Sequence, residues 1–172
     1  MLAGLRVAVD RLSETGGDDA AEAILTTDTA PKRAAVTRDG FTVGGMAKGA
    51  GMIHPVLATM LVVLTTDYPL AQEEADAFLR PAVEESFNRI SIDGDCSTND
   101  AVALLANGAS GVPRTVATDT SFAAVLHEVC GDLAKQIVAD GEGVTVVLEI
   151  QVSGATSDAE ATAIARRIAT SP

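Results

Sequence analysis

One apolar run in the middle of the chain limits the folds that it can adopt. Residues 60–66 read MLVVLTT, and the run contains no polar side chain before Thr65. A strand with one solvated face would alternate apolar and polar residues, so this composition predicts a strand that is buried on both faces. Such a strand needs a covering layer on each side, which indicates the α/β class.

The rest of the sequence predicts helices before and after this strand. Hydrophobic periodicity and turn residues predict helices over residues 2–12, 20–25, 71–88, 100–106, 121–140 and 158–169. Thr98 or Asn99 is expected to cap the fourth of these helices, and Ser157 the last. The order of elements after residue 70 fits either an α/β or an α+β unit.

Further strands are expected on both sides of the central one. Residues 32–43 predict a hairpin, because Asp39-Gly40 separates two short β-prone stretches. Residues 44–55 contain several glycines and show neither helical nor strand periodicity, so we expect a loop there. Two more strands are predicted, over residues 89–92 and 144–152.

Charge and composition exclude several classes of partner. The net charge is -12 and the sequence pI is about 4.4, whereas nucleic acids and anionic membranes bind basic surfaces. No apolar stretch approaches the roughly 18 residues that a transmembrane helix requires, and the first residues lack a signal-peptide pattern. Cys96 and Cys130 fit neither a disulfide framework nor a zinc site, so we expect reduced thiols and a cytoplasmic protein.

The Ala58-Thr59 junction is the first candidate for chemistry. It follows a glycine-rich, cationic loop and directly precedes the central strand, in the string KGAGMIHPVLATML of residues 48–61. If the peptide bond before Thr59 is cut, its freed α-amine lies beside its hydroxyl and can act as a general base. The reference pKa of such an amine, about 7.7–8.0, suits that role near neutral pH. Alternatively, Thr59 is an ordinary strand threonine.

Three further residues are candidates for binding a small polar substrate. Lys48 could meet a carboxylate as a point charge, or it could be a solvated surface lysine. Thr29, in TTDTAPK, could hydrogen-bond an amide or a carboxylate, although turn chemistry explains it equally well. Glu142 lies between two glycines and suits an ammonium ligand; otherwise it is an exposed loop acid.

No metal site is predicted. The acidic segment 93–104 lacks the glycine at the sixth position of a calcium loop and has Leu104 in place of the bidentate glutamate. His127 and Cys130 lack a second histidine on the same helix face, as a zinc protease helix would require.

The sequence resembles the ornithine acetyltransferase family, the bifunctional glutamate N-acetyltransferases of arginine biosynthesis. The resemblance runs nearly end to end. It rests on the strings MLAGL, DAAEAILTTDTAPK, KGAGMIHP, ATMLVVLTTD, SFNRISIDGDCSTND, AKQIVADGEG and AIARRIATSP. Of these, residues 91–100, which read SIDGDCSTND, are interpreted as a structural turn and cap near the site and not as ligands. Relatives commonly carry other residues at positions 54, 56 and 57.

The resemblance implies a specific reaction. After self-cleavage at Ala58-Thr59, an acetyl group moves from N-acetylornithine to glutamate through an acetyl ester on Thr59. No cofactor is implied, although acetyl-CoA is a possible acetyl donor. Substrate-binding roles are implied for Thr29, Lys48, Thr59 and Glu142. In the family, a Thr-Gly pair upstream of the region where this chain begins builds the oxyanion hole.

The resemblance also implies an architecture. We expect a layered α-β-β-α sandwich of the N-terminal-nucleophile type, with a smaller α/β domain. Residues 1–70 would belong to the catalytic domain and residues 71–172 to the smaller one. The two cleaved chains would stay associated, as a heterotetramer of two α and two β chains. The sequence would be an internal segment of a longer precursor.

Two other functions remain open on the sequence alone. An N-terminal-nucleophile aminopeptidase or amidase of the same architecture would use Thr59 identically but transfer the acyl group to water. A non-catalytic α/β binding module would leave the chain uncut and would tolerate Thr59→Ala.

Overall fold

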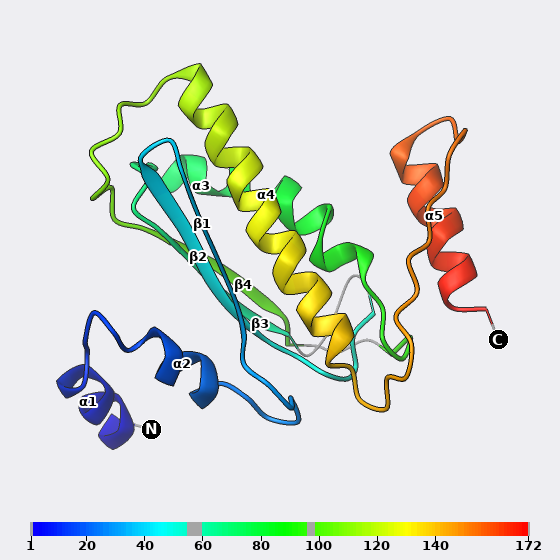
Figure 1. Ribbon diagram of the computed structural model, residues 1–172, viewed down its shortest axis with the longest axis horizontal. Helices are drawn as coiled ribbons and strands as arrows, with labels where there is room; N and C mark the ends of the chain where they lie inside the picture. Colours follow the sequence, from blue (N-terminus) through cyan, green and yellow to red (C-terminus); the bar gives the residue numbers. More distant parts are fainter. Residues whose placement is uncertain (1, 55–59, 96–98, 172) are drawn as a thin grey trace.

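The computed structural model describes residues 2–54, 60–95 and 99–171 of the chain (Figure 1). It contains helices and one four-stranded mixed sheet, so the expected α/β class is confirmed. The strands are β1 Lys32–Arg38, β2 Phe41–Lys48, β3 Leu61–Thr66 and β4 Ala101–Ala106. The helices are α1 Leu2–Asp10, α2 Gly17–Ala23, α3 Gln72–Glu84, the 3-10 helix η1 Phe87–Arg89, α4 Val116–Ala139 and α5 Asp158–Ala169.

The hairpin of β1 and β2 forms at the expected turn but has a longer second strand. Asp39 and Gly40 both adopt positive φ, 50° and 85°, as a tight hairpin turn between two twisted strands requires. The expected loop over 44–55 is wrong in its first part, because β2 continues to Lys48. Gly45, in the middle of β2, is required by packing, because a Cβ there would lie 2.7 Å from a methyl carbon of Leu64.

The fourth strand corrects a second expectation. Residues 101–106 were predicted to be helical, but they form β4, which pairs with β3 in parallel register from Leu61↔Ala101 to Thr66↔Ala106. Its sequence, AVALLA, is a short apolar run whose periodicity cannot distinguish a buried strand from a helix. With no helix there, Asn99 is not a helix cap, and Thr98, the other expected cap, lies outside the described residues.

The central strand β3 is buried on one face. Val62 and Leu64 are almost completely buried, whereas Leu61 is 42% exposed. Successive side chains of a strand point to opposite faces, so the inner face meets the core while the outer one is open. The expectation of burial on both faces is therefore wrong for the described residues.

The core lies between the inner face of the sheet and helices α3 and α4. Figure 1 shows α4 running alongside the strands, and it contacts β1, β2 and α3. Four aromatic rings fill the end of this core nearest the hairpin turn. Tyr68 stacks on Phe122 at a centroid distance of 4.6 Å, and Phe41 meets Tyr68 edge-on at 5.0 Å. Phe78 contacts Phe122 from α3.

The C-terminal part follows the expectations for its helix but not for its strand. Helix α5 has the predicted bounds, and the Ser157 hydroxyl caps it by accepting from the Glu160 N–H. Residues 144–152 form no strand. The strand expected over residues 89–92 is wrong as well, because η1 ends at Arg89 and an irregular segment follows. The run 144–152 alternates apolar and polar side chains except at Val147, but a strand also needs a hydrogen-bonded neighbour, and the described strands give it none.

Elements from both sides of residue 70 build the same sheet and the same core. β4 pairs with β3, and α4 packs on β1 and β2. The expected division into residues 1–70 and 71–172 stays a prediction that these contacts do not support. In the part of the chain that the structure describes, no helix is long and apolar enough to cross a membrane.

The packing predicts a contrast between two valines on the same helix. Val129 is fully buried on α4, whereas Val116 is 86% exposed at its start. Val129→Ala should lower the free energy of unfolding by roughly 2–3 kcal/mol, because it removes buried methyl groups and leaves a cavity. The matched change Val116→Ala should change it by no more than about 0.5 kcal/mol. Urea unfolding of both variants checks this, and equal losses would contradict the packing described.

Candidate functional site

The candidate site lies where β2 ends and β3 begins. Lys48 is the last residue of β2, is buried to 5% exposure, and pairs in register with Leu61. Leu61 lies two positions after Thr59, so the predicted substrate lysine lies beside the strand that the junction enters. Ala58 and Thr59 themselves lie outside the described residues.

Residues 93–101 hold the backbone on both sides of the junction, at Met52 and at Met60. The Met60 N–H donates to the Asp100 carboxylate at 2.8 Å, and the Met60 carbonyl accepts from the Ala101 N–H at 3.0 Å. The Met52 N–H donates to Asp93 at 2.6 Å. These contacts agree with a structural turn near the site. Asp100, however, holds the start of β3 instead of beginning a helix.

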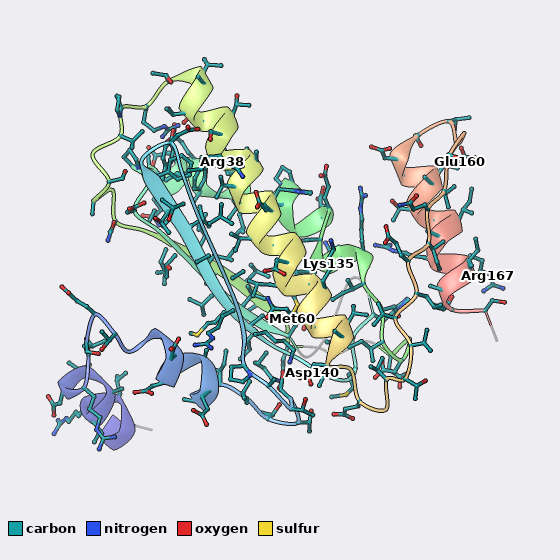
Figure 2. The ribbon with its side chains drawn as sticks, viewed as in Figure 1. Arg38, Met60, Lys135, Asp140, Glu160 and Arg167 are labelled. Carbon is teal, nitrogen blue, oxygen red and sulfur yellow. The ribbon has the colours of Figure 1, made fainter. Side chains whose placement is uncertain are left out.

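Asp28, Lys32 and Asp140 form a largely buried cluster of charged side chains at the site. The Lys32 ammonium lies 2.6 Å from a carboxylate oxygen of Asp28 and 2.6 Å from one of Asp140. The side chains of Asp28 and Lys32 are 0% and 2% exposed, and that of Asp140 is 12% exposed. Because Asp140 caps α4, this cluster joins the C-terminal end of that helix to the start of β1. Figure 2 shows Asp140 at that end of α4.

The cluster contacts one predicted substrate-binding position, Thr29, and the residue next to a second one, Lys48. The Thr29 hydroxyl donates to one Asp140 oxygen, and the Thr29 N–H donates to the other at 3.0 Å. The Gly49 N–H, next to Lys48, donates to Asp28 at 2.6 Å. Lys32 therefore links Thr29 to the end of β2, because its two carboxylate partners accept hydrogen bonds from these segments.

The third predicted position, Glu142, lies against the loop after β2. Its N–H donates to the Ala50 carbonyl at 2.6 Å. Its carboxylate passes so close to Gly51 that a Cβ there would lie 3.0 Å from the carboxyl carbon. Glu142 is exposed, in keeping with a group that could meet a ligand. The structure thus brings the surroundings of Thr29, Lys48 and Glu142 together from three distant parts of the sequence.

The electrostatics favour two ionised carboxylates in the cluster. Burial raises the pKa of Asp28, but hydrogen bonds from Lys32, Gly49 and Thr26 together outweigh it, so the net pKa is lowered. Burial likewise raises the pKa of Asp140, and the contacts from Lys32 and Thr29 outweigh it, again with a net lowering. Both groups are therefore hydrogen-bond acceptors at neutral pH.

The described cysteine, Cys130, takes no part in this site. Burial raises the pKa of the Cys130 thiol to about 12, which leaves it unreactive in the core. Cys96 lies outside the described residues. Within the described ranges, no group of three His, Cys, Asp or Glu side chains is arranged to hold a metal ion.

Sequence reasoning missed the three members of the buried cluster. Asp28 and Lys32 lie four positions apart within TTDTAPK, and Asp140 begins the string DGEG that was chosen for Glu142. The spacing of an acid and a lysine was the available signal. The ion pair of Lys32 with Asp140 spans 108 positions, however, and no local pattern reveals it.

The cluster predicts loss of stability in acid. A carboxylate whose pKa is lowered by folding contributes stability above its unfolded pKa, about 3.9 for Asp. That contribution is lost as the pH falls through the lower folded value. Lys32→Met leaves two buried carboxylates without their cation, so it should cost roughly 3–5 kcal/mol at neutral pH. It should also weaken the dependence of the free energy of unfolding on pH in the acid range.

Urea unfolding between about pH 7 and pH 3 measures both effects. Lys135→Met is the matched control, because Lys135 is exposed on α4 (Figure 2). Equal stability of the two variants at neutral pH would show that the buried ion pairs do not hold the site together.

The chain matches one protein family along its whole length. The family model described as the ArgJ family matches residues 1–172. The arginine biosynthesis bifunctional protein ArgJ of Mycolicibacterium paratuberculosis is 54% identical over 172 residues, covering 98% of this chain and 42% of that protein. The protein of the same name from Thermobifida fusca is 50% identical over 169 residues, covering 98% of this chain and 43% of that protein.

A solved structure agrees with these relatives. The crystal structure of the arginine biosynthesis bifunctional protein ArgJ from Bacillus halodurans is similar with a TM-score of 0.58 and 39% identity. The match covers 63% of this chain and 51% of that one. The chain spans less than half the length of the two curated relatives above. On these matches, the chain belongs to the ArgJ family.

Proposed function

We propose that this chain carries the nucleophile and much of the substrate site of a self-cleaving acetyltransferase of arginine biosynthesis. The enzyme moves an acetyl group from N-acetylornithine to glutamate. The observation that carries the proposal is that contacts of Thr29, of the neighbour of Lys48 and of Glu142 meet between the end of α4 and the loop that leads from β2 toward the 58–59 junction. The names of the relatives, which are bifunctional proteins of arginine biosynthesis, support it.

The first step is self-cleavage. The Thr59 hydroxyl attacks the Ala58 carbonyl carbon, and the acyl group shifts from nitrogen to oxygen. Water then hydrolyses the ester, which leaves a carboxylate on Ala58 and a free α-amine on Thr59. The anchoring of Met60 by Asp100 and Ala101 supports this step, because it fixes the residue on the far side of the nucleophile.

The second step is acetyl transfer. The α-amine of Thr59 accepts the proton of its own hydroxyl, and the oxygen attacks the acetamide carbonyl carbon of N-acetylornithine. The C–N bond breaks, ornithine leaves with the proton, and an acetyl ester remains on Thr59. The amine of glutamate then attacks the ester carbonyl, which forms N-acetylglutamate and restores the hydroxyl. Acetyl-CoA could replace N-acetylornithine as the donor, and no bound cofactor is needed.

The substrate contacts follow from charge. Lys48 suits the α-carboxylate of the amino acid, and Glu142 suits its free ammonium. Thr29 lies on the acidic side of the site, next to Asp140. The site is therefore suited to an amino acid that carries both charges, in agreement with N-acetylornithine and glutamate.

We also propose that the sheet is one half of the expected α-β-β-α sandwich. Helices α3 and α4 lie on its inner face, while Leu61 on β3 and Leu105 on β4 are 42% and 58% exposed on the other. A second sheet would cover this apolar face. The family's chains are more than twice as long as this one, which leaves room for it. The cleaved α and β chains would then stay associated as a heterotetramer in the cytoplasm.

Intact-mass analysis of the complete gene product and of its Thr59→Ala variant tests the proposal. The unmodified protein should give two fragments that separate at Ala58-Thr59, and it should transfer acetyl from N-acetylornithine to glutamate. Thr59→Ala should remain uncut and inactive, because it has no hydroxyl to start either step.

The competing functions give different results in the same experiment. Cleavage with release of acetate and no acetylglutamate would favour an aminopeptidase or amidase. One uncut mass for both proteins would leave a non-catalytic binding module.

A further inference from the structure

We propose that Asp140 is a positioning residue that makes the Thr29 hydroxyl a hydrogen-bond acceptor toward the substrate. Thr29 would then receive an N–H of the acetyl donor and would not bind its carboxylate. This inference rests on the proposed function and deepens it, because it assigns the orientation of the substrate within the site.

The hydrogen-bond capacity of Thr29 carries the argument. A threonine hydroxyl has one hydrogen to donate and two lone pairs that can accept. In the structure that hydrogen goes to one Asp140 oxygen, while the Thr29 N–H donates to the other oxygen. Thr29 is exposed, so a ligand can reach the remaining lone pairs of the hydroxyl. Those lone pairs can only accept.

Lys32 keeps Asp140 in the form that imposes this direction. A protonated Asp140 could itself donate to Thr29 and free the threonine hydrogen for a carboxylate ligand. The Lys32 ammonium, 2.6 Å from Asp140 and only 2% exposed, favours the ionised carboxylate. The same ammonium holds Asp28, whose side chain is fully buried.

The cluster also positions the residues next to Lys48 and Glu142. Asp28 accepts from the Gly49 N–H and so fixes the peptide that leaves Lys48. Asp140 lies two positions before Glu142, whose N–H is bonded to the Ala50 carbonyl. Acceptors for substrate N–H groups, Thr29 and Glu142, thus lie near the end of α4, and the cation Lys48 ends β2. A donor with an amide N–H, an ammonium and a carboxylate can satisfy both sides in one orientation.

A double-mutant cycle on the complete gene product tests the inference. Its members are the unmodified protein, Thr29→Val, Asp140→Asn and the double variant. Asp132→Asn is the matched control, because Asp132 is an exposed acid on the same helix. The measured quantities are kcat and KM for N-acetylornithine with glutamate as acceptor, together with the melting temperature of each protein.

If Asp140 acts through Thr29, the two changes are not independent. Each single variant should raise KM roughly tenfold, the effect of losing about one hydrogen bond, with kcat within about threefold of the unmodified protein. The double variant should raise KM no further than the larger single effect, and Asp132→Asn should leave KM unchanged. The inference would be overturned if the KM increases of the two single variants multiplied in the double variant. It would also be overturned if the variants lowered kcat and the melting temperature while KM stayed unchanged.

A second comparison applies if Asp140→Asn does not fold. Thr29→Ser keeps the hydroxyl that donates to Asp140, whereas Thr29→Val removes it. The inference requires a nearly unchanged KM for the serine variant and an increased KM for the valine variant, and equal KM values would overturn it. If the unmodified protein transfers no acetyl group at all, the proposed function itself fails. Transfer with an additive cycle removes only the role of Asp140.

Discussion

The ion pairs of Lys32 with Asp28 and Asp140 are the interactions on which the candidate site depends. Through these ion pairs the loop before β1 is joined to the end of α4, and the Gly49 N–H, directly after β2, donates to Asp28. A buried charge is tolerated only when its partners are well placed. The cluster therefore restricts these segments to one relative arrangement, and it contacts Thr29 and the neighbour of Lys48; Thr29 and Lys48 are two of the residues proposed to bind substrate.

The sheet provides the other requirement, a rigid support for the nucleophile. β3 has a hydrogen-bonded neighbour on each side, β2 antiparallel and β4 parallel. A strand in the middle of a sheet has little freedom to shift, and Met60 at its entrance is bonded to Asp100 and Ala101. Thr59 is the residue before Met60. The proposed chemistry thus begins one residue before a strand entrance that is held by hydrogen bonds, and catalysis depends on such precise positioning.

Local signals in the sequence predicted local structure, and non-local structure escaped them. The Asp39-Gly40 turn and the Ser157-capped helix α5 depend on neighbouring residues only, and both were predicted. Strand formation depends on a partner elsewhere: residues 101–106 found one in β3, and residues 144–152 found none among the described strands. The site shows the same division. Thr29, Lys48 and Glu142 were chosen from strings of neighbouring residues, whereas the buried cluster needed the folded chain.

The central claim is that Thr59 carries the acetyl group between donor and acceptor. The most direct measurement is the mass of the fragment that begins at Thr59, after brief incubation with N-acetylornithine and quenching in acid. We expect a gain of one acetyl group on Thr59, and its loss when glutamate is added before the quench. Transfer to glutamate without any acetylated fragment, in a protein whose Thr59→Ala variant is still active, would contradict it.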